Sequence, residues 1–231
     1  MRDDIQTLIG HYSETIKERG VVPEGILWPN APDLAIRFEV LLGGARLDKS
    51  TATRPVRLLD LGCGPAFLLD YLAANQADAH VDYTGVDVAE VMIGHARARW
   101  PDHRFELRDV RELPFPDEAF DFCIACGVFT ARFGNSYRTM VDFAQSTLSA
   151  IWKSVQGGLA FNVMSKHVDW ERDDLFHWPL DDIMEFCKAS LSRHVILRLD
   201  YGLWEASVTV LREPVRLTSL VPQPWLGSAE R

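Results

Sequence analysis

Two glycines one residue apart follow an apolar run, and an acid stands two positions ahead of the first of them. They are Gly62, Gly64 and Asp60 in the stretch LLDLGCGPAF, residues 58–67. A glycine-rich turn between a strand and a helix exposes backbone N–H groups, which commonly bind phosphate at the helix N-terminus. The carboxylate of Asp60 opposes that use, because it would place a negative charge beside the phosphate. The turn therefore predicts a ligand that approaches the backbone closely without being strongly anionic.

Motifs that bind nucleotide phosphates fit this turn poorly. The dinucleotide fingerprint is G-x-G-x-x-G, and Phe67 stands where its third glycine would be. A P-loop requires G-K-[ST], which occurs nowhere in the chain. A nicotinamide-dependent oxidoreductase is therefore the weaker alternative for this turn.

Further polar or small residues follow the other predicted strands. In open α/β sheets, ligands bind at the carboxyl ends of the strands, near the point where the strand order reverses. We therefore expect one ligand-binding rim, to which five consecutive strands contribute. The residues at these strand ends are Asp60, Asp87, Asp109, Cys126, Gly127 and His167.

The strands that position these residues are short apolar runs, which alternate with helical patterns from about residue 56 onward. This alternation predicts a parallel sheet with helices on both faces. The runs VILRLD and EASVTVL, joined by the short turn YGLW, predict an antiparallel hairpin at the edge of the sheet. A long helix that begins near Tyr137 is expected to end at Gly157 and Gly158. The expected fold is a Rossmann-like α/β fold with seven strands, mostly parallel.

Helical patterns also precede the sheet. Apolar residues at helical spacing over residues 5–16 predict a first helix, and Asn30 caps a second helix that begins at Pro32. We expect one structural domain in three segments. They are an N-terminal helical cap or lid at 1–48, a core at 49–213, and a tail at 214–231 that is a strap or partly disordered.

Composition argues against several classes of partner. Acidic side chains outnumber basic ones by 33 to 24, and a net charge of -9 disfavours nucleic acid. No apolar run reaches about 18 residues, and the N-terminus lacks the pattern of a secretory signal, so we expect no membrane contact and a cytoplasmic location.

Cys123 and Cys126 lie on one predicted strand at an odd separation, which sends their side chains to opposite faces. We therefore expect buried cysteines and no metal site.

Four blocks of sequence resemble the class I S-adenosylmethionine-dependent methyltransferases. The resemblance spans roughly residues 56–129, with supporting architecture to about residue 212. The third glycine often present in the family's first motif is Ala66 here. The resemblance implies S-adenosylmethionine as the cofactor, whose sulfonium and ammonium groups account for the acids. The blocks are LLDLGCG, YTGVDVAEVMIGHAR, FELRDVRELPFPDEAFD and FCIACGVF.

The resemblance implies a set of cofactor contacts. Asp60 matches a position near the ammonium group, and Asp87 one that accepts hydrogen bonds from both ribose hydroxyls. Asp109 and Val110 match the positions that contact adenine. The cofactor-binding residues expected in the core are Asp60, Gly62, Cys63, Gly64, Asp87, Val88, Asp109, Val110, Cys126 and Gly127.

The methyl acceptor is less determined. The segment after the fourth strand lacks an N-P-P-Y-like motif, which disfavours DNA adenine and glutamine side chains. His167 is the candidate general base, or else a solvated or capping histidine. Trp28 and Arg37 are expected to close over the cofactor, where Arg37 would bind its carboxylate. The alternative is that Arg37 is an arginine on the helix surface. The expected function is methyl transfer to an oxygen or nitrogen of a small molecule; the alternatives are a catalytically silent cofactor-binding protein and an NAD(P)-dependent oxidoreductase.

Overall fold

The computed structural model of the chain describes most of the predicted core. The first predicted helix lies partly outside the described residues, and the predicted tail lies almost wholly outside them. The described residues are 9–11, 14–16, 18–26, 28–45, 47 and 54–215.

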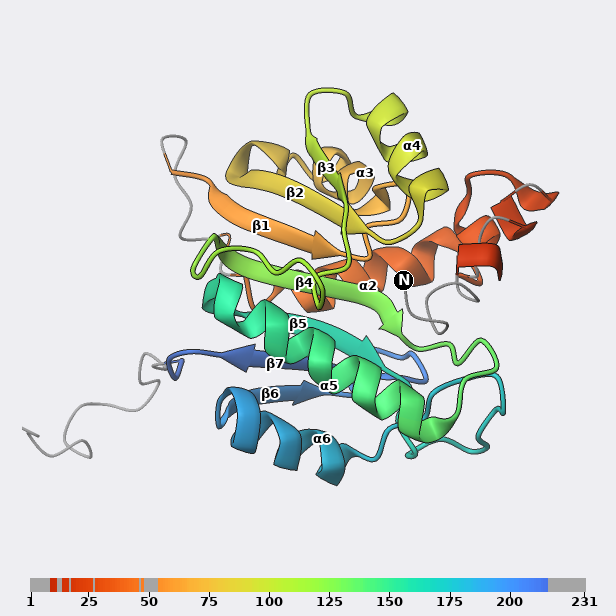
Figure 1. Cartoon of the computed structure of the whole chain (residues 1–231), viewed down its shortest axis with the longest axis vertical. Helices are drawn as coiled ribbons and strands as arrows, with labels where there is room; N and C mark the ends of the chain where they lie inside the picture. The colour runs from red at the N-terminus through yellow and green to blue at the C-terminus, as the bar shows by residue number, and fades with distance from the viewer. Residues whose placement is uncertain are drawn as a thin grey trace, which may run out of the picture.

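A single seven-stranded sheet with the order β3-β2-β1-β4-β5-β7-β6 forms the centre of the protein (Figure 1). Its first five strands in sequence are parallel, whereas β7 pairs antiparallel with both β5 and β6. This confirms the predicted Rossmann-like sheet with an antiparallel pair at one edge. The strands are β1 (Val56–Leu61), β2 (Val81–Asp87), β3 (Arg104–Leu107), β4 (Phe120–Phe129), β5 (Val155–Val163), β6 (His194–Arg198) and β7 (Ala206–Leu211).

Helices cover both faces of this sheet, as predicted. The α2, α3 and α4 helices share one buried cluster with the sheet, and α5 and α6 share another on the opposite face. The α2 helix, predicted within the N-terminal cap, packs directly on β4, β5 and β7. The helices are η1 (Pro23–Ile26), α2 (Ala31–Leu42), α3 (Phe67–Ala74), η3 (Asp78–His80), α4 (Glu90–Arg99), α5 (Tyr137–Ser154), α6 (Leu180–Phe186) and the π-helical turn η4 (Cys187–Leu191).

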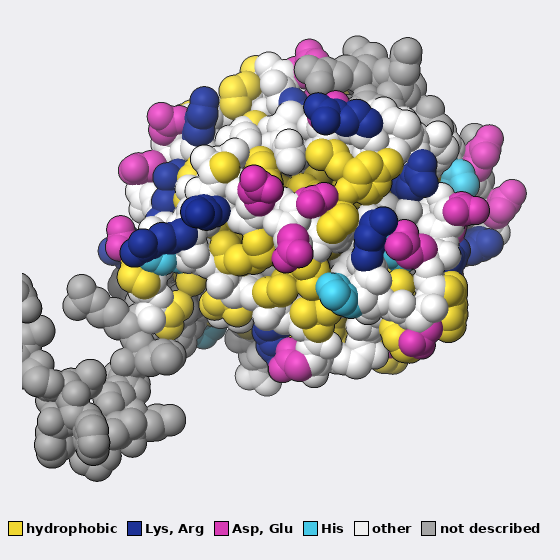
Figure 2. Space-filling model, turned by 90° about the horizontal axis from the view of Figure 1, so that it is seen from below, with side chains coloured by type: hydrophobic (Ala, Val, Ile, Leu, Met, Phe, Trp, Pro, Cys, Tyr) yellow, Lys and Arg dark blue, Asp and Glu magenta, His cyan; other side chains and the backbone are white. Residues whose placement is uncertain are grey.

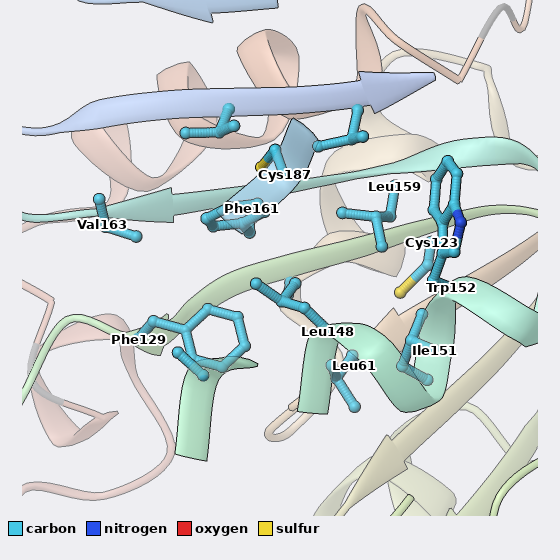
Figure 3. Close-up of a cluster of buried hydrophobic side chains, with 14 of the residues drawn as sticks. Leu61, Cys123, Phe129, Leu148, Ile151, Trp152, Leu159, Phe161, Val163 and Cys187 are labelled. Carbon is cyan, nitrogen blue, oxygen red and sulfur yellow. The ribbon is translucent and has the colours of Figure 1, made fainter. Parts of the chain in front are cut away.

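The core between α5 and the sheet explains why this helix forms (Figure 3). Leu148, Ile151 and Trp152 lie on its buried face and pack against apolar side chains of β4 and β5. Cys123 belongs to this cluster, whereas Cys126 packs against the cluster on the other face. The predicted separation of the two cysteines across the sheet is therefore confirmed.

Two predicted boundaries were wrong. The α5 helix ends at Ser154, and Gly157 and Gly158 lie within β5 instead of stopping the helix. Pairing explains this, because Gly158 lies opposite Leu211 of β7 and a Cβ at that position would overlap the carbonyl of Val210. The β6–β7 connection spans residues 199–205 and is longer than the predicted turn YGLW.

The surface mixes charges of both signs. On the face seen in Figure 2, acidic and basic side chains are interspersed among hydrophobic ones, and neither sign dominates. Among the described residues, no helix combines the length and the apolar character that crossing a membrane requires.

Candidate functional site

The glycine turn links β1 to α3 and lies against the end of β2. The backbone N–H groups of Gly62 and Cys63 donate to the carbonyl of Val86, at 2.8 and 3.0 Å. Gly62 has a φ of 71°, and a Cβ there would lie 2.6 Å from Cγ2 of Val128. Only glycine fits both the conformation and the space. The turn therefore presents backbone, without side chains, to the space beyond it.

Asp87 ends β2 and fastens the glycine turn. Its Oδ2 accepts from the N–H of Gly64 at 2.9 Å, and its Oδ1 accepts from the N–H of Ala89 at 2.9 Å. Burial raises the pKa of Asp87, while these backbone N–H groups lower it in part. Each carboxylate oxygen can accept more than one hydrogen bond, so Asp87 retains acceptor capacity for a ligand.

Asp109 follows β3, and Arg111 balances its charge. Its Oδ1 accepts from the backbone N–H and from Nε of Arg111, both at 3.0 Å, and an ion pair joins Oδ2 to the same guanidinium at 2.9 Å. The guanidinium lies 4.8 Å from the ring centroid of Phe143 on α5. Beside this pair, Val110 is buried and apolar. The rim is therefore close to neutral at this end.

A narrow cavity of about 120 Å³ runs along the carboxyl ends of β1, β2, β3 and β4. It brings together most of the residues that the sequence singled out as cofactor-binding. Neither Asp60, Cys63 nor Arg37 is part of its lining. The predicted residues that line it are Trp28, Gly62, Gly64, Asp87, Val88, Asp109, Val110, Cys126 and Gly127.

The α5 helix completes this cavity with residues that the sequence interpretation missed. Met140, Phe143 and Thr147 line it from one side. Their spacing of three and four residues was a usable signal, but it matches a core-facing stripe equally well. Thr147 Oγ1 is buried and, within the described part of the chain, has no hydrogen-bond partner. It is a polar atom available to a ligand.

Asp60 lies below the turn instead of facing the cavity. Its Oδ2 accepts from the hydroxyl of Tyr83 at 2.6 Å, and its side chain is buried. The pKa of Asp60 is raised to about 7, because burial and the nearby charge of Asp87 raise it more than the hydrogen bond from Tyr83 lowers it. Burial also raises the pKa of the Cys63 thiol well above its usual range, which favours the neutral form.

Trp28 lines the narrow cavity, and Arg37, which does not line it, contacts Trp28. The Arg37 guanidinium stacks 4.4 Å from the ring centroid of Trp28, whose indole packs on Gly127. Nε of Arg37 donates to both carboxylate oxygens of Glu205, at 3.1 and 2.9 Å. Asn162 links this pair to β4, because its Nδ2 donates to Glu205 Oε1 at 3.0 Å and its Oδ1 accepts from the N–H of Gly127 at 2.7 Å. Sequence reasoning missed both Glu205 and Asn162.

A second cavity, of about 680 Å³, adjoins the first. Arg37 and Glu205 lie in its wall, together with charged side chains from the described N-terminal segment and from the loop after β5. His167 is exposed and lines neither cavity; its backbone N–H bonds Ser165 Oγ at 2.9 Å. In the described part of the chain, no group of three or more His, Cys, Asp or Glu residues is placed to hold a metal ion. The residues common to both cavities are Ile26, Trp28, Gly127, Ala131 and Phe133.

Several known proteins are similar to this chain in sequence or in fold. A family model described as a methyltransferase domain matches residues 58–147. Rv1506c of Mycobacterium tuberculosis, a protein named for methyltransferase activity, is 32% identical over 161 residues, which cover 69% of this chain and 95% of that protein. The malonyl-acyl-carrier-protein O-methyltransferase of Serratia marcescens is 24% identical over 63% of this chain and 62% of its own length. The fold also matches the 1,6-didemethyltoxoflavin-N1-methyltransferase of Burkholderia thailandensis, solved with its substrate and S-adenosylhomocysteine, with a TM-score of 0.59, 17% identity and 91% of each chain covered.

Proposed function

Because the chain belongs to the class I S-adenosylmethionine-dependent methyltransferases, we propose that the narrow cavity holds S-adenosylmethionine and that the second cavity receives a small-molecule acceptor. One observation supports this most directly. Residues from four separate strand ends, chosen from the sequence as cofactor contacts, line one continuous cavity. A larger cavity lies directly beside it.

The residues present suit this cofactor. Asp87 has acceptor capacity for two ribose hydroxyls, and the glycine turn leaves room for close approach of the amino-acid part. The Asp109–Arg111 pair and Val110 form a nearly neutral border suited to an adenine ring. Thr147 Oγ1 adds one buried polar atom without a partner among the described residues. These features favour an uncharged adenosine group over a phosphate.

When bound, S-adenosylmethionine supplies a methyl group on a positively charged sulfur, which is already electrophilic. The work left to the protein is to orient the acceptor atom and to exclude water. Trp28, Gly127 and Phe133 lie where the two cavities meet, so they would border the reacting atoms. A hydroxyl or ammonium acceptor also requires a base. His167 would have to move toward the cavities to serve as that base.

The size of the second cavity supports a small acceptor. At about 680 Å³ it is larger than the narrow cavity of about 120 Å³, so it has room for a separate acceptor. Its wall contains both cationic and anionic side chains, so the acceptor is expected to be polar. We propose an oxygen or nitrogen atom as the methyl acceptor.

Titration calorimetry with S-adenosylhomocysteine tests the cofactor assignment. Asp87→Asn keeps the side-chain shape but removes the charge, and charge-assisted hydrogen bonds are worth about 1.5–3 kcal/mol, so affinity is expected to fall by roughly tenfold or more. Asp117→Asn, in the exposed loop before β4, is the matched control. Unchanged affinity in the Asp87 variant would refute the placement of the ribose.

The acceptor class is tested with a methyl-labelled cofactor. A cell lysate is separated into its small metabolites and its proteins. The protein is incubated with each of these two fractions separately. Label in the small-molecule fraction is the expected result. Label found only in macromolecules would overturn the small-molecule proposal while leaving methyl transfer itself intact.

A further inference from the structure

Trp28 and Gly127 line both cavities and form their shared wall, and both belong to a closed ring of five side-chain and backbone contacts. Trp28 stacks on Arg37, Arg37 pairs with Glu205, Glu205 bonds Asn162, and Asn162 bonds the N–H of Gly127. Gly127 closes the ring, because Trp28 packs where its Cβ would be. The ring joins α2, β4, β5 and the residue just before β7.

Glu205 is the centre of this ring. The side chain of Glu205 is only 2% exposed, and its carboxylate accepts hydrogen bonds from Arg37 and Asn162. The Tyr201 hydroxyl lies farther away, at 3.3 Å from the backbone carbonyl of Glu205 and 3.4 Å from Oε1. A buried carboxylate costs several kcal/mol unless it is paired and hydrogen-bonded. Arg37 is also buried, with 8% of its side chain exposed, and needs this charge. Glu205 and Arg37 therefore hold each other in place.

One arm of the ring fixes the backbone that lines the narrow cavity. In the β4–β5 ladder, Ala125 pairs with Phe161 but Phe129 pairs with Val163, so β4 contains a bulge between them. Gly127 lies in this bulge with a φ of 80°, and its N–H is bonded by the Asn162 side chain. The position of the bulge therefore depends on Asn162, which Glu205 orients.

The other arm fixes Trp28. Arg37 lies beneath the indole, and Glu205 determines where the guanidinium lies. Trp28 and Gly127 both line the two cavities. Asp87, Asp109 and Val110 suit the adenosine part of the cofactor, so the rest of the lining, at the glycine turn, Trp28 and Gly127, is left for its amino-acid part.

We propose that Glu205 is a positioning residue that holds this wall, through Arg37 and Asn162, against the amino-acid end of the cofactor. The inference rests on the proposed placement of the cofactor in the narrow cavity. It assigns Glu205 no direct contact with the reacting atoms. Its loss should weaken ligands that have the amino-acid part and spare those that lack it.

Two ligands separate this role from general stability. S-adenosylhomocysteine contains the amino-acid part, whereas 5′-methylthioadenosine contains the same adenosine without it. Glu205→Gln keeps the side-chain shape and an oxygen for Asn162 but removes the charge that faces Arg37. We expect its affinity for S-adenosylhomocysteine to fall roughly tenfold, because Trp28 and Gly127 lose their fixed position against the amino-acid part. Affinity for 5′-methylthioadenosine should stay within about twofold of the parent protein.

A second variant and a control complete the test. Asn162→Ser breaks the ring on its other arm without burying a charge, and the same selective loss is expected even if Glu205→Gln fails to fold. Glu185→Gln, on the exposed side of α6, should leave both affinities unchanged. Equal weakening of both ligands, or no weakening of either, would overturn the positioning role. If the unaltered protein binds neither ligand, the proposed cofactor placement itself fails.

Discussion

Asp60→Asn is expected to stabilise the protein at neutral and alkaline pH, and the effect should disappear in acid. Asp60 is buried, and its one side-chain hydrogen bond among the described residues comes from Tyr83 at 2.6 Å. Burial raises its pKa from 3.8 to about 7. Asparagine keeps an oxygen that can accept from Tyr83, but it has no charge to desolvate.

The magnitude follows from this pKa. Since the folded-state pKa lies above the unfolded one, the native protein binds the proton more tightly than the unfolded chain does. The associated stability is fully present below pH 3.8 and is lost as the pH rises through about 7. At about 1.4 kcal/mol for each pKa unit, the whole loss is on the order of 4 kcal/mol. Above pH 7 both states are ionised and the loss is complete.

Urea unfolding of the cofactor-free protein at pH 5, 6, 7 and 8 measures this. The free energy of unfolding of Asp60→Asn minus that of the parent protein should rise by up to about 1.4 kcal/mol per pH unit and level off above pH 7. Taking the difference cancels titrations common to both proteins. Asp102→Asn, on an exposed turn, should give a flat difference. A flat difference for Asp60→Asn as well would refute a raised pKa at this position.

Substitutions at three other positions probe the site. Gly127→Ala should lower stability by more than about 1 kcal/mol in thermal unfolding, because φ is 80° and the new methyl group would overlap Trp28; an unchanged melting temperature would contradict this packing. Ala66→Val should also destabilise the protein, by about 1–3 kcal/mol in urea unfolding, because a branched side chain would enter a left-handed, fully buried position, whereas Ala66→Gly should be close to neutral. Thr147→Val should leave the stability of the free protein unchanged or higher, because the hydroxyl has no partner among the described residues. The same change should reduce the affinity for S-adenosylhomocysteine several-fold. Equal affinity would show that this hydroxyl does not contact the cofactor.

That Asp87, Gly62 and Gly64 line one cavity was predictable because the signals are local. A strand that ends in Asp87, and a turn that needs glycine at Gly62 and Gly64, are each visible within a few residues. The parallel order of the strands then brings these ends together without any side-chain detail.

Glu205 was not predictable in the same way. It lies 168 positions after Arg37, its ion-pair partner, and nothing in the sequence around either residue indicates the other. Arg37 was assigned to the cofactor's carboxylate, and the structure pairs it with Glu205; its contact with the cofactor stays a prediction. Similarly, the end of α5 depends on whether Gly158 pairs with Leu211 of β7, which is a tertiary contact.

The ring through Trp28, Arg37 and Glu205 has a consequence for how this site tolerates substitution. Loss of Arg37 leaves the buried Glu205 carboxylate without its ion-pair partner, and loss of Asn162 leaves the N–H of Gly127 without its acceptor. The far side of the second cavity has no such constraint, because Arg19 and Arg172 are exposed. Residues on that side can therefore be exchanged one at a time, whereas Arg37, Glu205 and Asn162 have to change together.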